Sequence, residues 1–379
     1  MRAIVASSTA ARTEEALLDV VSQLYQARRV GRNDGCALVF ASEHHALHAR
    51  ALASALSDIL HPEPFIGWFG AEAFGGAPSE EGIPRLVVLV LEGCVAVART
   101  TPQRGPGGVI AAGLCAELPP GSVRFLATAA DRLDVRSVLT ALDEQWSPVV
   151  GAAGDGRGAA GPTALGPRLG EEPSAALLAA SGVRSLIGVT HGVRSVGPVS
   201  PYRQAKGSVL TTVGNRPAYS VLREDLRRAG VVDLFDLPKR LLCGVRASPD
   251  DEFSLLQCLG IGTTSGDLHL EDEIPDEGEA FFALRDDAIA RAELEEMLGR
   301  MKDALDARRR IACVIFSDRD RDQTFFGAPR FEAERVEDVL GGEGIPVVGI
   351  SGTAQYGAEG GVTLRHRHAC VVCVLYVEP

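Results

Sequence analysis

The sequence feature that most constrains the fold is a seven-residue pattern, Pro-apolar-apolar-Gly-x-x-Gly, which occurs three times in the chain. The copies span residues 64–70, 148–154 and 346–352. Each copy follows an apolar stretch and an amphipathic stretch of helical period. Glycine at the end of a strand permits positive φ angles and a close approach of two backbones. The pattern therefore predicts three strand–helix–strand units, each ending in a tight glycine turn.

The elements around the three turns are expected in the same order. Apolar strands at 86–91 and 368–376 follow the first and third turns, each after a polar or glycine-rich loop. Internal duplication explains this order, and so do the similar packing requirements of unrelated strand–helix–strand units. The strand and helix before each turn are expected at 36–41 and 44–60, at 123–128 and 132–146, and at 311–317 and 331–340.

These units place the chain in the α/β class, with mixed α+β sheets. Its 379 residues are enough for two or three domains at roughly 100–200 residues each. Glycine, proline and serine cluster around residues 192–204. We therefore expect two domains, 1–195 and 196–379, built from the repeated units with Gly-x-x-Gly turns. A layered sheet-on-sheet sandwich covered by helices is the alternative architecture.

Two pairs of neighbouring apolar strands are expected to form hairpins. Short loops that contain glycine between two such strands are typical of antiparallel hairpins. The first pair is 86–91 and 94–99 across Glu92-Gly93, and the second is 174–180 and 184–190 across Ser181-Gly182.

Composition excludes several classes of function. The net charge is −12 and only 5% of residues are aromatic. Nucleic-acid binding requires a basic face, so we expect no nucleic-acid partner. No apolar run approaches the roughly 18 residues of a membrane span, and residues 1–6 are expected to form a strand rather than a signal peptide. The eight cysteines lie mostly in apolar runs such as 36–40, which favours buried thiols in a reducing cytoplasm.

Two motifs that resemble cofactor or metal sites lack part of the required pattern. Gly-x-Gly-x-x-Gly occurs at 156–161, but proline follows it instead of the helix start that a dinucleotide site needs. His44, His45 and His48 lie at a helix start, without the glutamate of the metalloprotease pattern. An exposed helix start explains these histidines. We therefore expect no cofactor and no metal.

The run Asp318-x-Asp320-x-Asp322 begins like a calcium loop. Such a loop needs glycine at its sixth position and a carboxylate at its twelfth, where this chain has glutamine and proline. We interpret the run as a solvated segment in which Arg319 and Arg321 pair with neighbouring aspartates.

Several of these segments together resemble the FIST family, named for F-box and intracellular signal transduction proteins. The resemblance covers about residues 30–377. Ser195 replaces a family proline, and Ser317–Arg321 replaces a Cys-x-Gly-Arg-Gly-like segment, which puts the identity of the ligand in doubt. The matching segments are 36–40, 66–72, 149–161, 192–198, 208–213, 215–218 and 349–361 with His366.

The resemblance implies a cytoplasmic sensory role in signal transduction, with a small ligand such as an amino acid or related carboxylate. It implies no established catalytic activity. Because FIST domains often accompany kinase or cyclase modules, we expect the protein to act through a separate partner of that kind. Arg194 or Arg216 is expected to hold a carboxylate by a two-pronged hydrogen bond, unless each makes a structural ion pair instead. The candidate ligand-binding residues are Trp68, Glu72, Asp155, His191, Arg194, Arg216, Arg319, Ser351, Gln355 and Tyr356.

Two other functions remain open at this point. An enzyme would use Cys313, Ser351 or a histidine, and it would need a nucleophile and a base within hydrogen-bond reach. A protein-interaction module without a small ligand would expose an apolar patch. The residues expected in such a patch are Trp68, Phe69, Phe325 and Phe326.

Overall fold

The computed structural model comprises two compact units. Unit 1 contains Met1–Thr190 and Leu294–Pro379, and unit 2 contains His191–Glu293. The residues that it describes are 1–27, 35–61, 63–76, 82–102, 113–114, 118, 121–129, 135–143, 149–154, 164–165, 173–231, 240–262, 264–342, 344–359 and 361–378.

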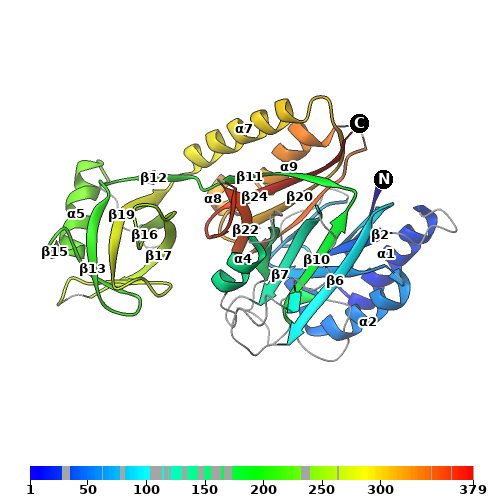
Figure 1. Ribbon diagram of the computed structural model, residues 1–379, viewed down its shortest axis with the longest axis horizontal. Helices are drawn as coiled ribbons and strands as arrows, with labels where there is room; N and C mark the ends of the chain where they lie inside the picture. Colours follow the sequence, from blue (N-terminus) through cyan, green and yellow to red (C-terminus); the bar gives the residue numbers. More distant parts are fainter. Residues whose placement is uncertain are drawn as a thin grey trace. The chain divides into compact units, whose positions relative to one another are not determined.

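Unit 1 contains three mixed sheets with the same strand arrangement (Figure 1). In each sheet, a parallel pair of strands lies between antiparallel neighbours. Sheet 1 is ordered β1 (Arg2–Ser8), β5 (Leu86–Glu92), β2 (Gly35–Ser42), β3 (Phe65–Gly70) and β9 (Ala164–Leu165). Sheet 2 is ordered β6 (Val95–Pro102), β10 (Pro173–Ser181), β7 (Val123–Ala129), β8 (Val149–Gly154), β22 (Ala354–Glu359) and β23 (Val362–His366). Sheet 3 is ordered β11 (Arg184–Thr190), β24 (Cys370–Val377), β20 (Arg309–Asp318), β21 (Val347–Gly352) and β4 (Ala73–Phe74).

The strand after each glycine turn leaves its own sheet and joins another. Strand β4 follows β3 of sheet 1 and pairs with β21 of sheet 3. Strand β22 follows β21 and pairs with β8 of sheet 2, and β9 follows β8 and pairs with β3 of sheet 1. The exchange is therefore cyclic, and each turn lies where the chain crosses from one sheet to the next.

The two predicted hairpins are wrong. Strand β5 lies between β1 and β2, so neither of its edges is available to β6, which pairs with β10 in sheet 2. Strand β10 likewise lies between β6 and β7, and β11 pairs with β24 in sheet 3. The short glycine loops were recognised correctly as turns, but they connect different sheets.

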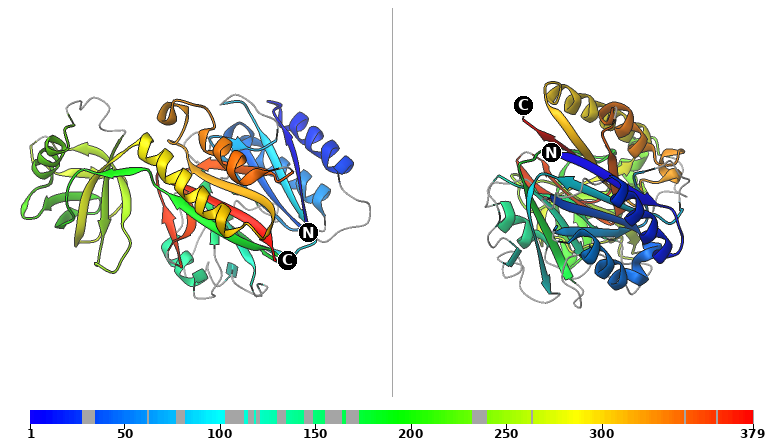
Figure 2. Two further views of the ribbon diagram at one scale, coloured as in Figure 1. Left: turned by 90° about the horizontal axis from the view of Figure 1, so that it is seen from above. Right: turned by 90° about the vertical axis from the view of Figure 1, so that its right-hand side faces the viewer.

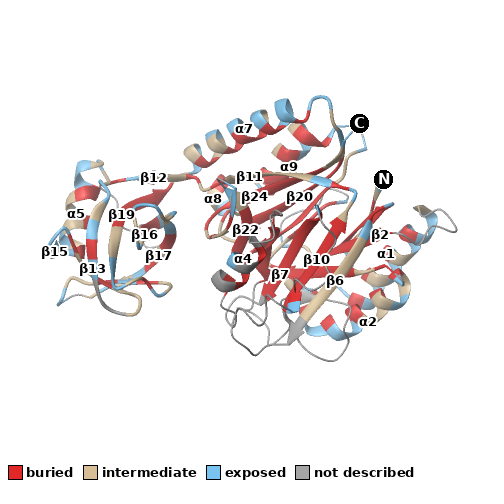
Figure 3. Cartoon of the chain, in the orientation of Figure 1, coloured by how far each residue is buried: buried red, intermediate tan, exposed pale blue. Residues whose placement is uncertain are grey.

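The three sheets share one apolar core, and helices cover their outer faces. Strands β2 and β5 are buried at every residue, as expected where both faces of a sheet are covered (Figure 3). The seven cysteines among the described residues are buried and unbridged, as predicted. The covering helices are α1 (Thr13–Ala27) and α2 (Ala49–Leu60) on sheet 1, α4 (Val135–Asp143) on sheet 2, and α7 (Asp287–Ala304, from Leu294 on) and α9 (Phe331–Val336) on sheet 3 (Figure 2).

Unit 2 is a small closed barrel around its own apolar core, an element that the sequence did not predict. Helix α5 (Ala218–Arg228) contributes Ala218, Leu222 and Leu226 to that core. Strands β12 (Val193–Ser195) and β15 (Arg216–Pro217) pair with β19 (Glu277–Arg285) and β14 (Val209–Val213) respectively. The barrel closes in the order β19 (Glu277–Arg285), β13 (Ser200–Lys206), β14 (Val209–Val213), β18 (Leu268–Leu270), β17 (Ser254–Ile261) and β16 (Leu241–Arg246), which pairs again with β19.

The α/β class with mixed sheets is confirmed. The compact units do not follow the expected boundary at residue 195, because the segment from Leu294 onward packs with the N-terminal part of the chain. Family domains at 1–195 and 196–379 therefore remain a prediction, distinct from the units of packing. No helix among the described residues is long and apolar enough to cross a membrane.

Candidate functional site

The three glycine turns share one strand register. A Cβ atom at Gly151 or Gly349 would collide with the carbonyl oxygen of its partner on the neighbouring strand, Leu126 or Ile315. Glycine is therefore required at both positions by the same close approach of two backbones. The first glycine of each turn pairs as Gly67 with Val39, Gly151 with Leu126, and Gly349 with Ile315.

The three turns are joined to one another by hydrogen bonds. The Ala71 amide donates to the Ser351 carbonyl at 3.0 Å, and the Ser351 amide donates to the Glu72 carbonyl at 2.8 Å. On the other side, the Thr353 amide donates to the Ala153 carbonyl at 3.2 Å. We call this region, residues 70–72, 153–154 and 351–355, the turn junction. It brings together segments from all three predicted units.

Four predicted ligand residues lie at or beside the turn junction. The Ser351 hydroxyl accepts a hydrogen bond from the Glu72 amide at 2.8 Å. The Arg319 amide and the Gln355 side-chain amide both donate to the Gly352 carbonyl, at 2.9 and 3.3 Å. The Gln355 side chain is fully buried, and its Oε1 has no hydrogen-bond donor among the described residues. This oxygen is an unused acceptor at the junction.

Two other predicted ligand residues, Trp68 and Tyr356, are fully buried structural residues. The Trp68 ring stacks on Phe40 with their centroids 5.2 Å apart, and its Nε1 donates to the Leu126 carbonyl at 3.2 Å. The Tyr356 hydroxyl bonds to the Thr128 hydroxyl. Burial raises the pKa of Tyr356, so the neutral phenol persists at neutral pH. Both side chains contribute packing to unit 1.

Three predicted ligand residues lie in unit 2 and do not belong to the turn junction of unit 1. The Arg194 guanidinium pairs with Asp286 at 3.5 Å, and the Arg216 guanidinium pairs with Glu224 at 2.8 Å. These are the structural ion pairs expected as the alternative for each arginine. The His191 amide donates to the Glu293 carboxylate at 3.1 Å. Asp155 lies outside the described residues.

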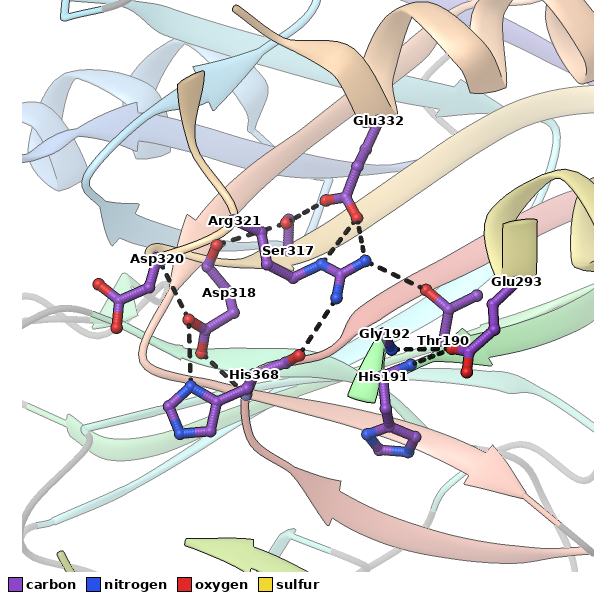
Figure 4. Close-up of polar contacts among 10 residues, drawn as sticks. All are labelled: Thr190, His191, Gly192, Glu293, Ser317, Asp318, Asp320, Arg321, Glu332 and His368. Atoms are coloured by element: carbon purple, nitrogen blue, oxygen red, sulfur yellow. Dashed lines mark hydrogen bonds and ion pairs between the residues drawn. The ribbon is translucent and has the colours of Figure 1, made fainter. Parts of the chain in front are cut away.

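The end of β20 carries a buried polar cluster that the sequence interpretation missed (Figure 4). Asp318 is 3% exposed, so the predicted solvated run is wrong at this residue. Its carboxylate accepts from the His368 amide at 3.1 Å and from the Asp320 amide at 3.0 Å. Asp322 instead caps α8 (Gln323–Phe326) by accepting from the Phe325 amide. Only spatial proximity to His368, fifty residues away, reveals the cluster.

Arg321, which was expected to pair with a neighbouring aspartate, forms a buried ion pair with Glu332. Its fully buried guanidinium contacts Glu332 of α9 at 2.8 and 2.7 Å, and Ser317 donates to the same carboxylate (Figure 4). Burial alone would lower the pKa of Arg321, but the negative charges around it, Glu332 foremost, raise the pKa overall. The guanidinium therefore stays charged and joins the turn after β20 to α9.

A second missed feature is a pair of buried arginines near Glu72. Arg85 is 2% exposed and donates to the Gly75 carbonyl at 2.8 Å. Burial and the positive charge of Arg330 lower the pKa of Arg85, whereas Glu72 and Glu337 oppose that shift. Arg330 is 8% exposed, and its Nε has no acceptor among the described residues. Neither arginine belongs to a recognisable motif.

The surroundings of Cys313 and Ser351 do not favour either residue as a nucleophile. Cys313 is fully buried, and burial raises its pKa to about 12, so its nucleophilic thiolate is scarce at neutral pH. The Ser351 hydroxyl contacts backbone groups of Glu72. The apolar patch that an interaction module would expose is not formed by Trp68, Phe69 and Phe326, which are buried core residues of unit 1, and Phe325 is half-buried.

Residues 35–216 match the FIST N domain. The match confirms the FIST resemblance over these residues. FIST domains are sensory modules of signal transduction. The matched segment includes two of the three glycine turns and extends into unit 2.

Curated relatives occur in mycobacteria. Uncharacterized protein Rv0628c of Mycobacterium tuberculosis is 26% identical over 191 residues, and Uncharacterized protein Mb0898c of Mycobacterium bovis is 24% identical over 191 residues. Each match covers 49% of this chain and 49% of the relative, so the chain spans about half the length of the curated relatives it matches. Their names assign no ligand or activity.

Proposed function

We propose that this protein is a cytoplasmic sensor that binds a small carboxylate ligand, such as an amino acid, beside the turn junction. A separate signalling partner, such as a kinase or cyclase, then recognises the ligand-bound form of the protein. The match of residues 35–216 to the FIST N domain supports the sensory role. The observation that carries the choice of ligand is the buried pair Arg85 and Arg330, with the Nε of Arg330 unused by the described residues.

Electrostatics favour an anion at this position. Two like charges buried near one another are costly unless opposite charge compensates them. The carboxylate of Glu337 lies 3.9 Å from the Arg330 guanidinium, and the Glu337 side chain is 44% exposed. A carboxylate ligand would accept the donors of a guanidinium in two parallel hydrogen bonds. It would also relieve the repulsion that lowers the pKa of Arg85.

The turn junction supplies groups for the rest of such a ligand. The Gln355 Oε1 is a buried acceptor without a donor among the described residues, and Glu72 carries a partly exposed carboxylate. Both accept from an ammonium group, as the amino end of an amino acid would require. Leaving a buried acceptor unsatisfied costs about 1–3 kcal/mol, which a bound donor would offset.

A thermal-shift screen tests the proposal. The panel contains amino acids, other small carboxylates and their neutral amide analogues. A ligand at 100 times its Kd stabilises the folded state by about 2.7 kcal/mol, so the expected result is a rise in Tm of several degrees with a carboxylate and none with its amide. The variant Arg330→Met should lose the shift. Arg335→Met, which removes an exposed arginine paired with Glu295, is the matched control and should retain it.

Two outcomes would overturn the proposal. The first is the absence of a shift with every carboxylate in the panel. The second is a shift that persists in Arg330→Met. If the Tm shift persists in Arg330→Met, the variant Arg194→Ala locates the ligand. Loss of the Tm shift in Arg194→Ala alone would place the carboxylate in unit 2.

A further inference from the structure

Three potential metal ligands meet at the end of β20. Asp318, Asp320 and His368 each offer one ligand atom, and these atoms all lie within 4.8 Å of one another. Asp318 and His368 are 3% and 5% exposed, whereas Asp320 is partly exposed. The cluster lies within unit 1 and does not include the residues proposed above to bind a carboxylate.

The backbone holds the three residues in place without a ligand. The Asp318 amide donates to the Ala369 carbonyl at 2.9 Å, which fixes the end of β20 against the start of β24. The Asp318 carboxylate accepts from the amides of Asp320 and His368 (Figure 4). A site with such fixed ligands is largely ordered before an ion binds, which lowers the entropic cost of binding.

The spacing of the side chains suits an ion better than a direct contact. The Nδ1 of His368 lies 3.8 Å from the Oδ1 of Asp318, which is too long for a hydrogen bond. Ligands of one metal ion lie at most two bond lengths apart, or about 4–4.8 Å for bonds of about 2.0–2.4 Å. All three ligand atoms can therefore reach one ion with small side-chain movements.

The buried Arg321 beside the cluster has an acidic partner of its own. Arg321 directs its guanidinium to Glu332, through contacts of 2.7 and 2.8 Å. The guanidinium also donates to the His368 carbonyl and the Thr190 hydroxyl. Arg321 thus stabilises the backbone at one side of the cluster.

We propose that Asp318, Asp320 and His368 form a binding site for a divalent transition-metal cation, such as Mn²⁺ or Zn²⁺. Two carboxylates and one imidazole are a mixed oxygen and nitrogen donor set, which favours these ions over Ca²⁺. Three protein ligands leave coordination positions open for water or a small ligand. The partly exposed Asp320 provides the side from which the ion enters. This site is independent of the proposed carboxylate ligand.

Isothermal titration of the full chain, after removal of metal with EDTA, tests the proposal. We expect Mn²⁺ or Zn²⁺ to bind one-to-one, with Ca²⁺ binding more weakly. The variants His368→Asn and Asp320→Asn should each weaken binding at least about tenfold. Asparagine suits position 368 because it tolerates the positive φ of 56° found there. The matched control is Asp322→Asn, which changes the same acidic run but keeps a good helix cap and should bind as wild type does.

A spectroscopic measurement separates ligation from a general effect on folding. Pulsed electron paramagnetic resonance of bound Mn²⁺ should show coupling to one nitrogen, and the coupling should disappear in His368→Asn while far-UV circular dichroism stays unchanged. Either of two results overturns the proposal. One is the absence of one-to-one binding by any of the tested ions. The other is binding that His368→Asn and Asp320→Asn weaken no more than Asp322→Asn does.

Discussion

The ends of β2 and β20 occupy equivalent positions in two sheets, yet their chemistry differs. Ser42 pairs with Gly70 of the first turn, and Asp318 pairs with Gly352 of the third. Each side chain accepts a hydrogen bond from a backbone amide before the next strand of its sheet. Ser42 accepts from Arg85 at 2.9 Å, and Asp318 accepts from His368 at 3.1 Å.

The difference shows which features the fold requires and which it does not. A neutral hydroxyl is sufficient to satisfy the backbone amide at the first strand end. The equivalent hydrogen bond at the end of β20 therefore requires neither the negative charge of Asp318 nor the imidazole of His368. Groups at a strand end that the fold does not require are candidates for binding, since loops and strand ends carry function more often than the sheet interior does.

The largest expected effect concerns the buried ion pair behind Asp318. Glu332→Ala should lower the free energy of unfolding by about 3–5 kcal/mol, because it leaves the fully buried guanidinium of Arg321 without its counter-charge. Glu295→Ala removes the partner of the more exposed Arg335 and should cost much less. Denaturant unfolding of the two variants measures the contrast, and equal losses would show that the buried pair is not a special feature of this strand end.

Because the second and third glycine turns have the same close backbone approach, substitution of their first glycine should destabilise the protein similarly. Gly151→Ala and Gly349→Ala should each destabilise the protein by about 3 kcal/mol or more, because the new Cβ collides with a backbone carbonyl that has little room to move. Gly299→Ala in α7 meets open space and should stabilise by about 0.5–1 kcal/mol. Thermal unfolding gives the values. Tolerance of either turn substitution would contradict the shared close approach.

The stability of the region after β2 should depend on pH because of His45. This residue lies in the short helix η1 (Glu43–His48), which begins directly after Ser42. Burial, with smaller contributions from His44 and His48, lowers the pKa of His45 to about 4. Between about pH 6.5 and 4, position 45 is protonated in the unfolded chain but not in the folded protein. The contribution of His45 to the free energy of unfolding is therefore complete above this range and is lost as the pH falls through it.

The expected loss from His45 over this window is about 2–3 kcal/mol, as the difference between wild type and His45→Gln. Comparing the two proteins cancels the titration of the remaining carboxylates. Unfolding free energies at pH 7, 5.5 and 4 provide the test, and parallel pH curves for the two proteins would contradict the lowered pKa.

The smallest expected change in unfolding free energy comes from altering the side-chain acceptor at each strand end, Ser42 or Asp318. Ser42→Ala should cost about 1–2 kcal/mol, because the Arg85 amide loses its acceptor. Asp318→Ser should cost about 1 kcal/mol or less, because the new hydroxyl replaces the main acceptor of the His368 amide. If Asp318→Ser lowered the free energy of unfolding much more than Ser42→Ala does, the carboxylate of Asp318 would be required by the fold.

Local patterns predicted the strand–helix–strand units well but not their partners. The turn pattern located β3, β8 and β21, because strand periodicity and glycine are local signals. The pairing of β5 and β6 was predicted wrongly, because the choice of sheet depends on which strand edges are already occupied. The barrel was missed because its short strands carry bulges and irregular registers, as between β13 and β14.

The candidate site could be outlined from the sequence only in part, for a similar reason. Ser351, Gln355 and Glu72 became candidates because they adjoin the glycine turns, and their ligand role stays a prediction. Arg330 and His368 were missed, because each becomes significant only through burial beside a segment distant in sequence. The burial of a charged side chain has no local signature in the sequence.

The most direct test of the difference between the two strand ends is anomalous diffraction from crystals of the full chain soaked in Mn²⁺. We predict a peak between Asp318, Asp320 and His368 and no peak beside Ser42. A map without a peak at Asp318 at saturating Mn²⁺, or with peaks of equal height at both strand ends, would contradict the assignment of binding to the end of β20.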